Sequence, residues 1–313
     1  MQLYGLDSLT HPISGYPTLP DYLPFNPNPR APAPLPPPLS CDSQFHVFGP
    51  REQYPVRPGA AYEMPTATWR EAQRLHATLG IERGVIVQAT TYGADHTVVL
   101  DALQALNADR PGRYLACANA AVLHERDDAY LQKLHDAGVR GARFSRAGLG
   151  IAQSPAEQAR ALAQIKELGW YLKVQPEPHG IAQQLADLES ADIPIMLDHM
   201  GRIDPAAGDA DPSLRRILEL FERGNFWVML SLSEKLSRLG EPWDDVVPVA
   251  QRLIEAAPDR CVWGSDWPHP LSLKPPPDEG ALVELLYRFA PDAATRQKIL
   301  VDNPAQFFGF ATP

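Results

Sequence analysis

The chain has 313 residues, of which 44% are hydrophobic and 21% are charged, and its formal net charge at pH 7 is −10. These values are ordinary for a globular protein with one large domain or two medium ones. The negative charge argues against general binding to nucleic acid or to anionic membranes, because both partners would be repelled.

The cysteines and the N-terminus bear on the compartment. Cys41, Cys117 and Cys261 lie in or beside apolar runs and are far apart in the sequence, which is typical of buried free thiols in a reducing compartment. The first residues lack the basic region followed by an apolar core that marks a signal peptide. No apolar run approaches the roughly 18 residues that span a bilayer. We therefore expect a cytoplasmic protein without a membrane segment.

Residues 1–40 differ in composition from the rest of the chain. They contain eleven of the 33 prolines, which remove backbone donors and fix φ, so neither a helix nor a central strand can form there. We expect an extended proline-rich arm that lies on the body of the protein or on a neighbouring subunit. The second arrangement would make the chain a homo-oligomer that uses its arm.

Eight short apolar runs recur from residue 41 onward and predict β-strands. Amphipathic stretches between them, such as residues 66–80, 154–169 and 211–224, have the periodicity of helices. Near-continuous apolar strands that alternate with helices are typical of a parallel sheet covered by helices. We therefore predict an α/β fold in which residues 41–313 form a closed (β/α)8 TIM barrel. The expected strands are residues 41–48, 84–90, 113–120, 139–145, 170–175, 193–199, 226–233 and 260–266.

The alternative architecture is an open doubly wound sheet. Such a sheet usually carries a glycine-rich phosphate turn after its first strand, and the sequence there, HVFGP, has none. Helix ends are marked by Ser154, Pro155 and Glu157 at a start and by Gly169 and Gly224 at two ends.

Polar and charged side chains gather at the C-terminal ends of most expected strands, where barrels of this kind place their chemistry. A single residue such as His46 is more often a hydrogen-bonded structural residue. The joint pattern is hard to explain by packing and predicts a functional site. Five other histidines fall in the arm, on helical patterns or in loops, and we expect them at the surface: His11, His76, His96, His124 and His135.

Several segments carry a family resemblance: FHVFGP, VIVQAT, VRGARF, IPIMLDHMGR, VWGSDWPHP and DNPAQFFGF. Together they closely resemble the amidohydrolase superfamily over roughly residues 41–310. The nearest branch is the one of 2-pyrone-4,6-dicarboxylate lactonase and D-galactarolactone isomerase. The motifs DHMGR and WGSDWPHP, in this order and placement, are its most specific signals.

The resemblance implies a catalytic set of Asp266, His199, His46 and Gln44. The family has a His-x-His pair after its first strand; the second member matches His46, and Gln44 replaces the first. Substrate-binding positions also differ, because Gln175 stands where a tyrosine is expected and Lys235 where an arginine is expected. The strand ends and the resemblance together give these substrate-binding candidates: Tyr62, Thr90, Arg143, Arg146, Gln175, Arg202 and Lys235.

The presence of Gln44 in place of the family's first histidine determines whether we expect a bound metal ion. A glutamine amide is neutral and a weak ligand, so it lowers the affinity of such a site for zinc. The implied branch works without metal, and we expect no cofactor. The alternative is one divalent ion, such as zinc, held by His46, His199 and Asp266.

The resemblance implies a metal-independent hydrolase that opens the lactone ester of a small carboxylated substrate. Asp266 would act as general base, His199 with His46 and Gln44 would donate to the oxyanion, and the Arg and Lys candidates would hold carboxylates. Isomerisation of a sugar-acid lactone is the first alternative. A metal-dependent amidohydrolase or decarboxylase on the same barrel, and a non-enzymatic binding scaffold, are the others.

Overall fold

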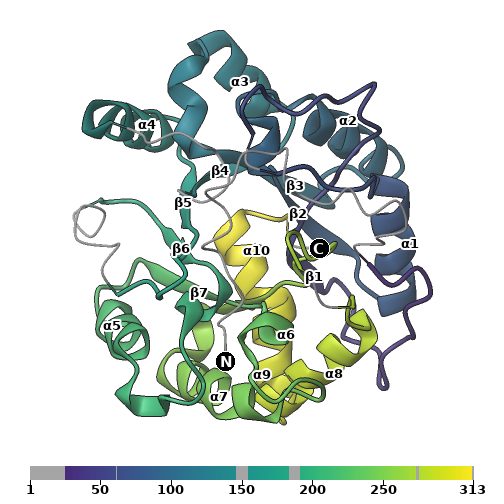
Figure 1. Cartoon of the computed structure of the whole chain (residues 1–313), viewed down its shortest axis with the longest axis vertical. Coiled ribbons are helices and arrows are strands. Elements are labelled where there is room, and N and C mark those ends of the chain that lie inside the picture. Colours follow the sequence, from purple (N-terminus) through teal and green to yellow (C-terminus); the bar gives the residue numbers. More distant parts are fainter. Residues whose placement is uncertain (1–24, 61, 146–153, 183–190, 273–274, 312–313) are drawn as a thin grey trace.

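The computed structural model describes residues 25–60, 62–145, 154–182, 191–272 and 275–311. Residues 1–24 of the arm, with His11, and the candidate Arg146 lie outside the described residues. Eight parallel strands follow one another around the sheet in chain order, and helices surround them (Figure 1). The strands are β1 Cys41–Phe45, β2 Arg83–Val87, β3 Tyr114–Asn119, β4 Val139–Phe144, β5 Tyr171–Val174, β6 Ile195–Leu197, β7 Phe226–Leu230 and β8 Cys261–Trp263.

This arrangement confirms the predicted barrel, and every expected strand overlaps an observed one, with β2 beginning one residue earlier than expected, at Arg83. The observed strands are shorter because their C-terminal residues turn away into the loops that carry the polar side chains. The helices are α1 Trp69–Leu79, α2 Thr97–Leu106, α3 Asp128–Asp136, α4 Pro155–Glu167, α5 Pro212–Phe221, α6 Ser233–Leu236, α7 Val247–Ala256, α8 Glu279–Phe289, α9 Ala293–Gln297 and α10 Asn303–Phe308.

The helix ends follow local chemistry. At α4 the Ser154 hydroxyl accepts from the backbone N–H of Glu157, and the Glu157 carboxylate accepts from the Ser154 N–H in return. Gly169 and Gly224 adopt φ of 64° and 86°, the left-handed conformation that ends a helix at little steric cost. None of the helices in the described ranges combines the length and apolar character needed to cross a bilayer.

The barrel closes between β1 and the segment after β8. The His46 N–H donates to the Trp267 carbonyl at 2.7 Å, and the Asp266 N–H donates to the Gln44 carbonyl at 2.9 Å. Asp42, which is fully buried, reinforces this seam: its Oδ1 accepts from the Ser265 N–H at 2.9 Å and its Oδ2 from the Ser265 hydroxyl at 2.5 Å. The two edges of the sheet are therefore joined beyond the last residue of β8.

Two histidines that were expected at the surface, His76 and His96, are buried. His76 on α1 is buried, and its Nε2 lies 3.3 Å from Asp42 Oδ2. His96 is buried as well, so the predicted surface location is wrong for both residues. On α1 the buried residues Ala72, Leu75 and Leu79 share one helical face with His76, which explains its burial.

The interior of the barrel is packed rather than open. Apolar side chains from β1, β2, β3, β5, β6, β7 and β8 form one buried cluster there, and Phe308 and Phe310 belong to it. Figure 1 shows α10 across the middle of the ring of strands. Because these aromatic rings close the N-terminal end of the barrel, only the C-terminal ends of the strands remain for a site.

The described part of the arm, residues 25–40, contacts the barrel of the same chain. Phe25 is buried against Trp267, with ring centroids 4.9 Å apart. Arg30 pairs with Glu284 on α8, and its carbonyl lies so close to Gly280 that a Cβ there would be 2.2 Å away. Phe25 and Arg30 therefore contact the segment after β8 and helix α8 of the same chain.

Candidate active site

The candidate site is centred on Asp266, just beyond β8. A register shift between Asp42 and Phe45 of β1 lets Gln44 and His46 both approach it. Gly264 makes room for this arrangement, because a Cβ at that position would lie 2.9 Å from the Gln44 Cβ. The local geometry of both strands therefore allows the end of β1 to contact Asp266.

Four side chains surround the Asp266 carboxylate. Its Oδ1 accepts from Gln44 Nε2 at 2.9 Å and lies 3.4 Å from His46 Nε2. Its Oδ2 pairs with Lys235 Nζ at 3.2 Å. His199 completes the group, with its Nε2 3.4 Å from Gln44 Nε2. The structure thus brings together all four residues of the expected catalytic set, and each of the four is buried.

The hydrogen bonds define the protonation of His46. Its Nδ1 lies 2.8 Å from the Val87 carbonyl, which can only accept, so Nδ1 carries the proton. The neutral ring therefore presents the lone pair of Nε2 to Asp266 Oδ1. Two acceptors that face each other at 3.4 Å can hold one proton between them.

A similar argument applies to His199. The Gln44 amide nitrogen donates to Asp266, so the same nitrogen is also the donor toward His199 Nε2. The proton of the neutral His199 ring is then on Nδ1, which lies 2.9 Å from the Ser231 hydroxyl. In this state neither imidazole offers an Nε2 proton to an oxyanion, which differs from the role expected from the sequence.

Electrostatics keep the carboxylate charged and the rings neutral. Burial lowers the pKa of His199 to about 4, despite the nearby carboxylates of Asp266 and Asp198. Burial also lowers the pKa of His46, against the hydrogen bond with Asp266. Burial alone would raise the pKa of Asp266, but the ammonium of Lys235 acts in the opposite direction, and that pKa is held well below its usual range.

The backbone of the site is held in an unusual conformation. His199, Arg202 and Asp266 have φ of 54°, 52° and 60°, in the left-handed region that side chains other than glycine rarely adopt. Such residues cost about 1–3 kcal/mol each and persist where the surrounding structure fixes them. They occur here at the very positions that aim functional side chains into the mouth of the barrel.

Positive charge is in excess beside this group. Lys173 and Arg143 share one carboxylate, Asp198, at 2.9 Å and 3.7 Å. The Nε of Arg202 is buried and has no hydrogen-bond partner among the described residues. Burial lowers the pKa of Arg202, although Asp266 acts in the opposite direction. These guanidinium groups have N–H donors to offer to an anionic ligand.

The remaining candidates fall into two groups. The Tyr62 hydroxyl lies 3.2 Å from the Thr90 hydroxyl, and both residues are buried. Burial raises the pKa of Tyr62, which keeps its hydroxyl protonated as a donor. Gln175 follows β5 and is half-buried, and its backbone N–H donates to the Phe144 carbonyl.

One residue of this end of the barrel escaped the sequence-based selection. Asn119 ends β3, is buried, and neither its Nδ2 nor its Oδ1 has a partner in the described part of the chain. It alternates with Leu115 and Cys117, which face the barrel interior, and its Cα pairs with that of Arg143. The alternation along the strand was the signal that could have identified it.

The donor set does not fit a divalent cation. Both oxygens of Asp266 already face N–H donors, from Gln44 and from Lys235, and a metal would compete for the same lone pairs. Among the described residues, no three His, Cys, Asp or Glu side chains are placed to hold a metal ion together.

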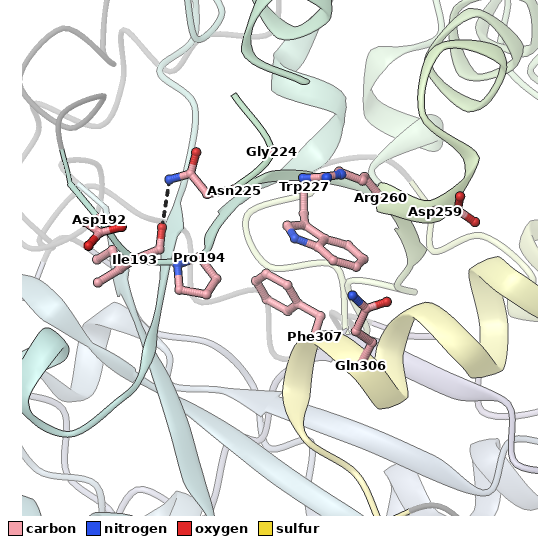
Figure 2. A pocket seen from close by; sticks show the side chains of 10 residues that line it. All are labelled: Asp192, Ile193, Pro194, Gly224, Asn225, Trp227, Asp259, Arg260, Gln306 and Phe307. Atoms are coloured by element: carbon pink, nitrogen blue, oxygen red, sulfur yellow. Dashed lines mark hydrogen bonds between the residues drawn. The ribbon is translucent and has the colours of Figure 1, made fainter. Parts of the chain in front are cut away.

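A separate hollow of about 440 Å³ lies at the opposite end of the barrel. It is lined by residues just before β6, β7 and β8 and by α10, and Figure 2 shows the rings of Trp227 and Phe307 beside each other. Their centroids are 5.0 Å apart. No member of the catalytic set lines this hollow, and chemistry in such barrels belongs to the other end.

The sequence model of the family described as amidohydrolase matches residues 24–310 of this chain. A 4-sulfomuconolactone hydrolase from Hydrogenophaga intermedia is 35% identical over 87% of this chain and 89% of its own length. A 2-pyrone-4,6-dicarboxylate hydrolase from Comamonas testosteroni is 34% identical over 95% of this chain and 98% of its own length.

Two further proteins extend the comparison. A D-galactarolactone isomerase from Agrobacterium fabrum is 29% identical over 89% of this chain and 94% of its own length. A crystal structure of an Agrobacterium tumefaciens protein without ligand is 28% identical, with a TM-score of 0.75, and the match covers 90% of this chain and 100% of that one.

The lowered pKa values give a direct prediction. We expect the His46 ring to stay neutral to a lower pH than an exposed histidine does, and the His199 ring to become protonated only near pH 4. The unfolded chain binds these protons near pH 6.5, so the free energy of unfolding should decrease as pH drops through that window. Histidine NMR titrations, with resonances assigned through His46→Gln and His199→Gln, measure both values. Midpoints near 6.5 for both rings would contradict the described site.

Proposed function

This chain belongs to the amidohydrolase family, and on that premise we propose that it is a hydrolase that opens the ester of a small carboxylated lactone. The observation that carries the proposal is the arrangement at Asp266, where a buried carboxylate with a lowered pKa meets two imidazoles and a lysine. Relatives at 34% and 35% identity that are named as hydrolases of lactones support it.

The charges of the site support an acidic substrate. The chain carries a net charge of −10, yet Arg143 and Lys173 share a single carboxylate and Arg202 Nε lacks a partner in the described part of the chain. Because buried positive charge needs a counter-ion, acidic groups of the substrate would complete these pairs. Arg143 and Arg202 suit carboxylates, since a guanidinium can donate two parallel hydrogen bonds.

The proposed reaction needs one base and a set of donors. Asp266 takes a proton from a water molecule, whose oxygen bonds to the lactone carbonyl carbon. His46 Nε2, 3.4 Å from Asp266 Oδ1, shares that proton. The ring C–O bond then breaks, and the same proton passes to the leaving oxygen. The donors for the oxyanion are the neighbouring cations, because the Gln44 amide nitrogen already donates to Asp266 and His199 and both imidazole Nε2 atoms are acceptors in this state.

We also propose that the reaction proceeds without metal. The ammonium of Lys235 supplies positive charge at the oxygen of Asp266 that a cation would otherwise bind. A lactone is an activated ester, so a general base and hydrogen-bond donors can suffice to open it.

Isomerisation is the second candidate function. One relative, at 29% identity, is named as an isomerase of a sugar-acid lactone. Gln44 and Gln175, which replace the residues expected from the resemblance, offer hydrogen bonds to substrate hydroxyls. With such a substrate the same base would move the acyl group between hydroxyls rather than to water.

The compartment is a smaller proposal. Cys41, Cys117 and Cys261 are all free and buried. Free thiols are typical of a reducing compartment, so we place the protein in the cytoplasm.

The general-base role makes the first functional prediction. On the carboxylated lactone that the wild-type protein opens fastest, Asp266→Asn should lower kcat by more than about 100-fold, because an amide cannot accept the water proton. The substrate is found by screening carboxylated lactones and identifying products by proton NMR, which also separates ring opening from isomerisation. Asp128→Asn, on the exposed start of α3, is the control and should be unaffected. More than a hundredth of normal turnover in Asp266→Asn would refute the role.

The second functional prediction concerns metal. Protein purified without chelator should contain less than about 0.1 equivalent of zinc or manganese, and dialysis against a strong chelator should leave kcat unchanged. Elemental analysis before and after dialysis, paired with the lactone assay, measures both. One tightly bound ion per chain whose removal abolishes turnover would overturn metal independence.

A further inference from the structure

A second buried charge cluster lies directly behind the site. His269 follows β8 by six residues and is fully buried. Its Nδ1 lies 3.2 Å from Glu234 Oε1 on α6, and its Nε2 lies 3.4 Å from Glu279 Oε1 on α8. One imidazole therefore joins three segments that are separated in the sequence. The function proposed above gives this cluster no task.

The geometry requires a charged ring. Both ring nitrogens face carboxylate oxygens, and both contacts are favourable only when each nitrogen carries a proton. Burial acts to lower the pKa of His269, but the two carboxylates outweigh it and raise that pKa to about 9. The pKa of Glu234 is lowered in return, chiefly through His269 against the effect of burial.

The cluster is connected to the site by two short paths. Along α6, Glu234 precedes Lys235, whose Nζ lies 3.2 Å from Asp266 Oδ2 and donates to the Pro270 carbonyl at 3.0 Å. Along the chain, the His269 N–H donates to the Asp266 carbonyl at 2.7 Å. His269 and Asp266 also share left-handed φ values, 56° and 60°. His269 therefore contacts the surroundings of both partners of the Lys235–Asp266 pair, through its imidazole at Glu234 and through its backbone N–H at Asp266.

We propose that His269, held between Glu234 and Glu279, is a positioning residue that sets Lys235 on Asp266 and keeps the Lys235 ammonium available to an acidic group of the substrate. The inference rests on the proposed function for its kinetic consequence, but its structural consequence is independent of any activity. If His269 only stabilised the fold, its replacement would destabilise α6 and α8 without a specific effect on the position of Lys235.

A double-mutant cycle separates these roles. His269→Gln and Lys235→Gln should each lower kcat/KM by at least about tenfold, mainly through a higher KM. The kcat/KM of the double variant should equal, within about twofold, that of the less active single variant. Multiplied losses in the double variant, or wild-type kinetics in His269→Gln, would overturn the inference. His135→Gln, near the other end of the barrel, is the control; its Gln can still accept from Trp170.

Two additions keep the test decisive. If His269→Gln does not fold, His269→Gln combined with Glu279→Gln removes one buried carboxylate with the imidazole, and the cycle is run in that background. A crystal structure of the folded variant should show Lys235 Nζ moved away from Asp266 Oδ2. A Lys235 that stays 3.2 Å from Asp266 refutes the positioning role, whatever the activity. A wild-type protein that opens no lactone refutes the proposed function instead.

Discussion

A single buried carboxylate, Asp42, holds together the two strands on which the site depends. It accepts from the Gln44 N–H at 3.1 Å and from the Ser265 N–H at 2.9 Å, so both edges of the seam donate to the same oxygen. Without it these buried N–H groups would lose their partner, which costs about 1–3 kcal/mol for each group. Because Gln44 is itself anchored and Asp266 directly follows Ser265, the bonds that close the barrel also set the distance between catalytic side chains.

The environment of Asp266 involves a compromise between charge and basicity. Lys235 favours the ionised form of the carboxylate and lowers its pKa, but a carboxylate with a lowered pKa is a weaker base. A weak base is adequate when the reacting carbonyl belongs to an activated ester and donors already surround it. The same lysine can release Asp266 in favour of an acidic substrate group, which would make the base stronger only once the substrate is bound.

Local patterns made most of the barrel predictable. Apolar runs and helical periodicity are properties of neighbouring residues, and the cap at Ser154 could be predicted from the four residues SPAE. His76 could also have been placed inside, because it shares a helical face with Leu75 and Leu79. Asp42 could not, since its partner Ser265 is 223 residues away and only barrel closure unites them. The protonation of the imidazoles was likewise unpredictable, because it is set by the Val87 carbonyl and by the direction of the Gln44 amide.

The central claim is that one lactone carbonyl meets groups from the first and eighth strands at the mouth of the barrel. A crystal structure of the Asp266→Asn variant with a dicarboxylated lactone bound tests it most directly. The account predicts the carbonyl carbon beside the Asn side chain, the carbonyl oxygen within hydrogen-bond reach of Lys235 or Arg202, and acidic groups on Arg143 or Arg202. A lactone bound in the hollow lined by Trp227 and Phe307, or with its carbonyl turned away from residue 266, would contradict it.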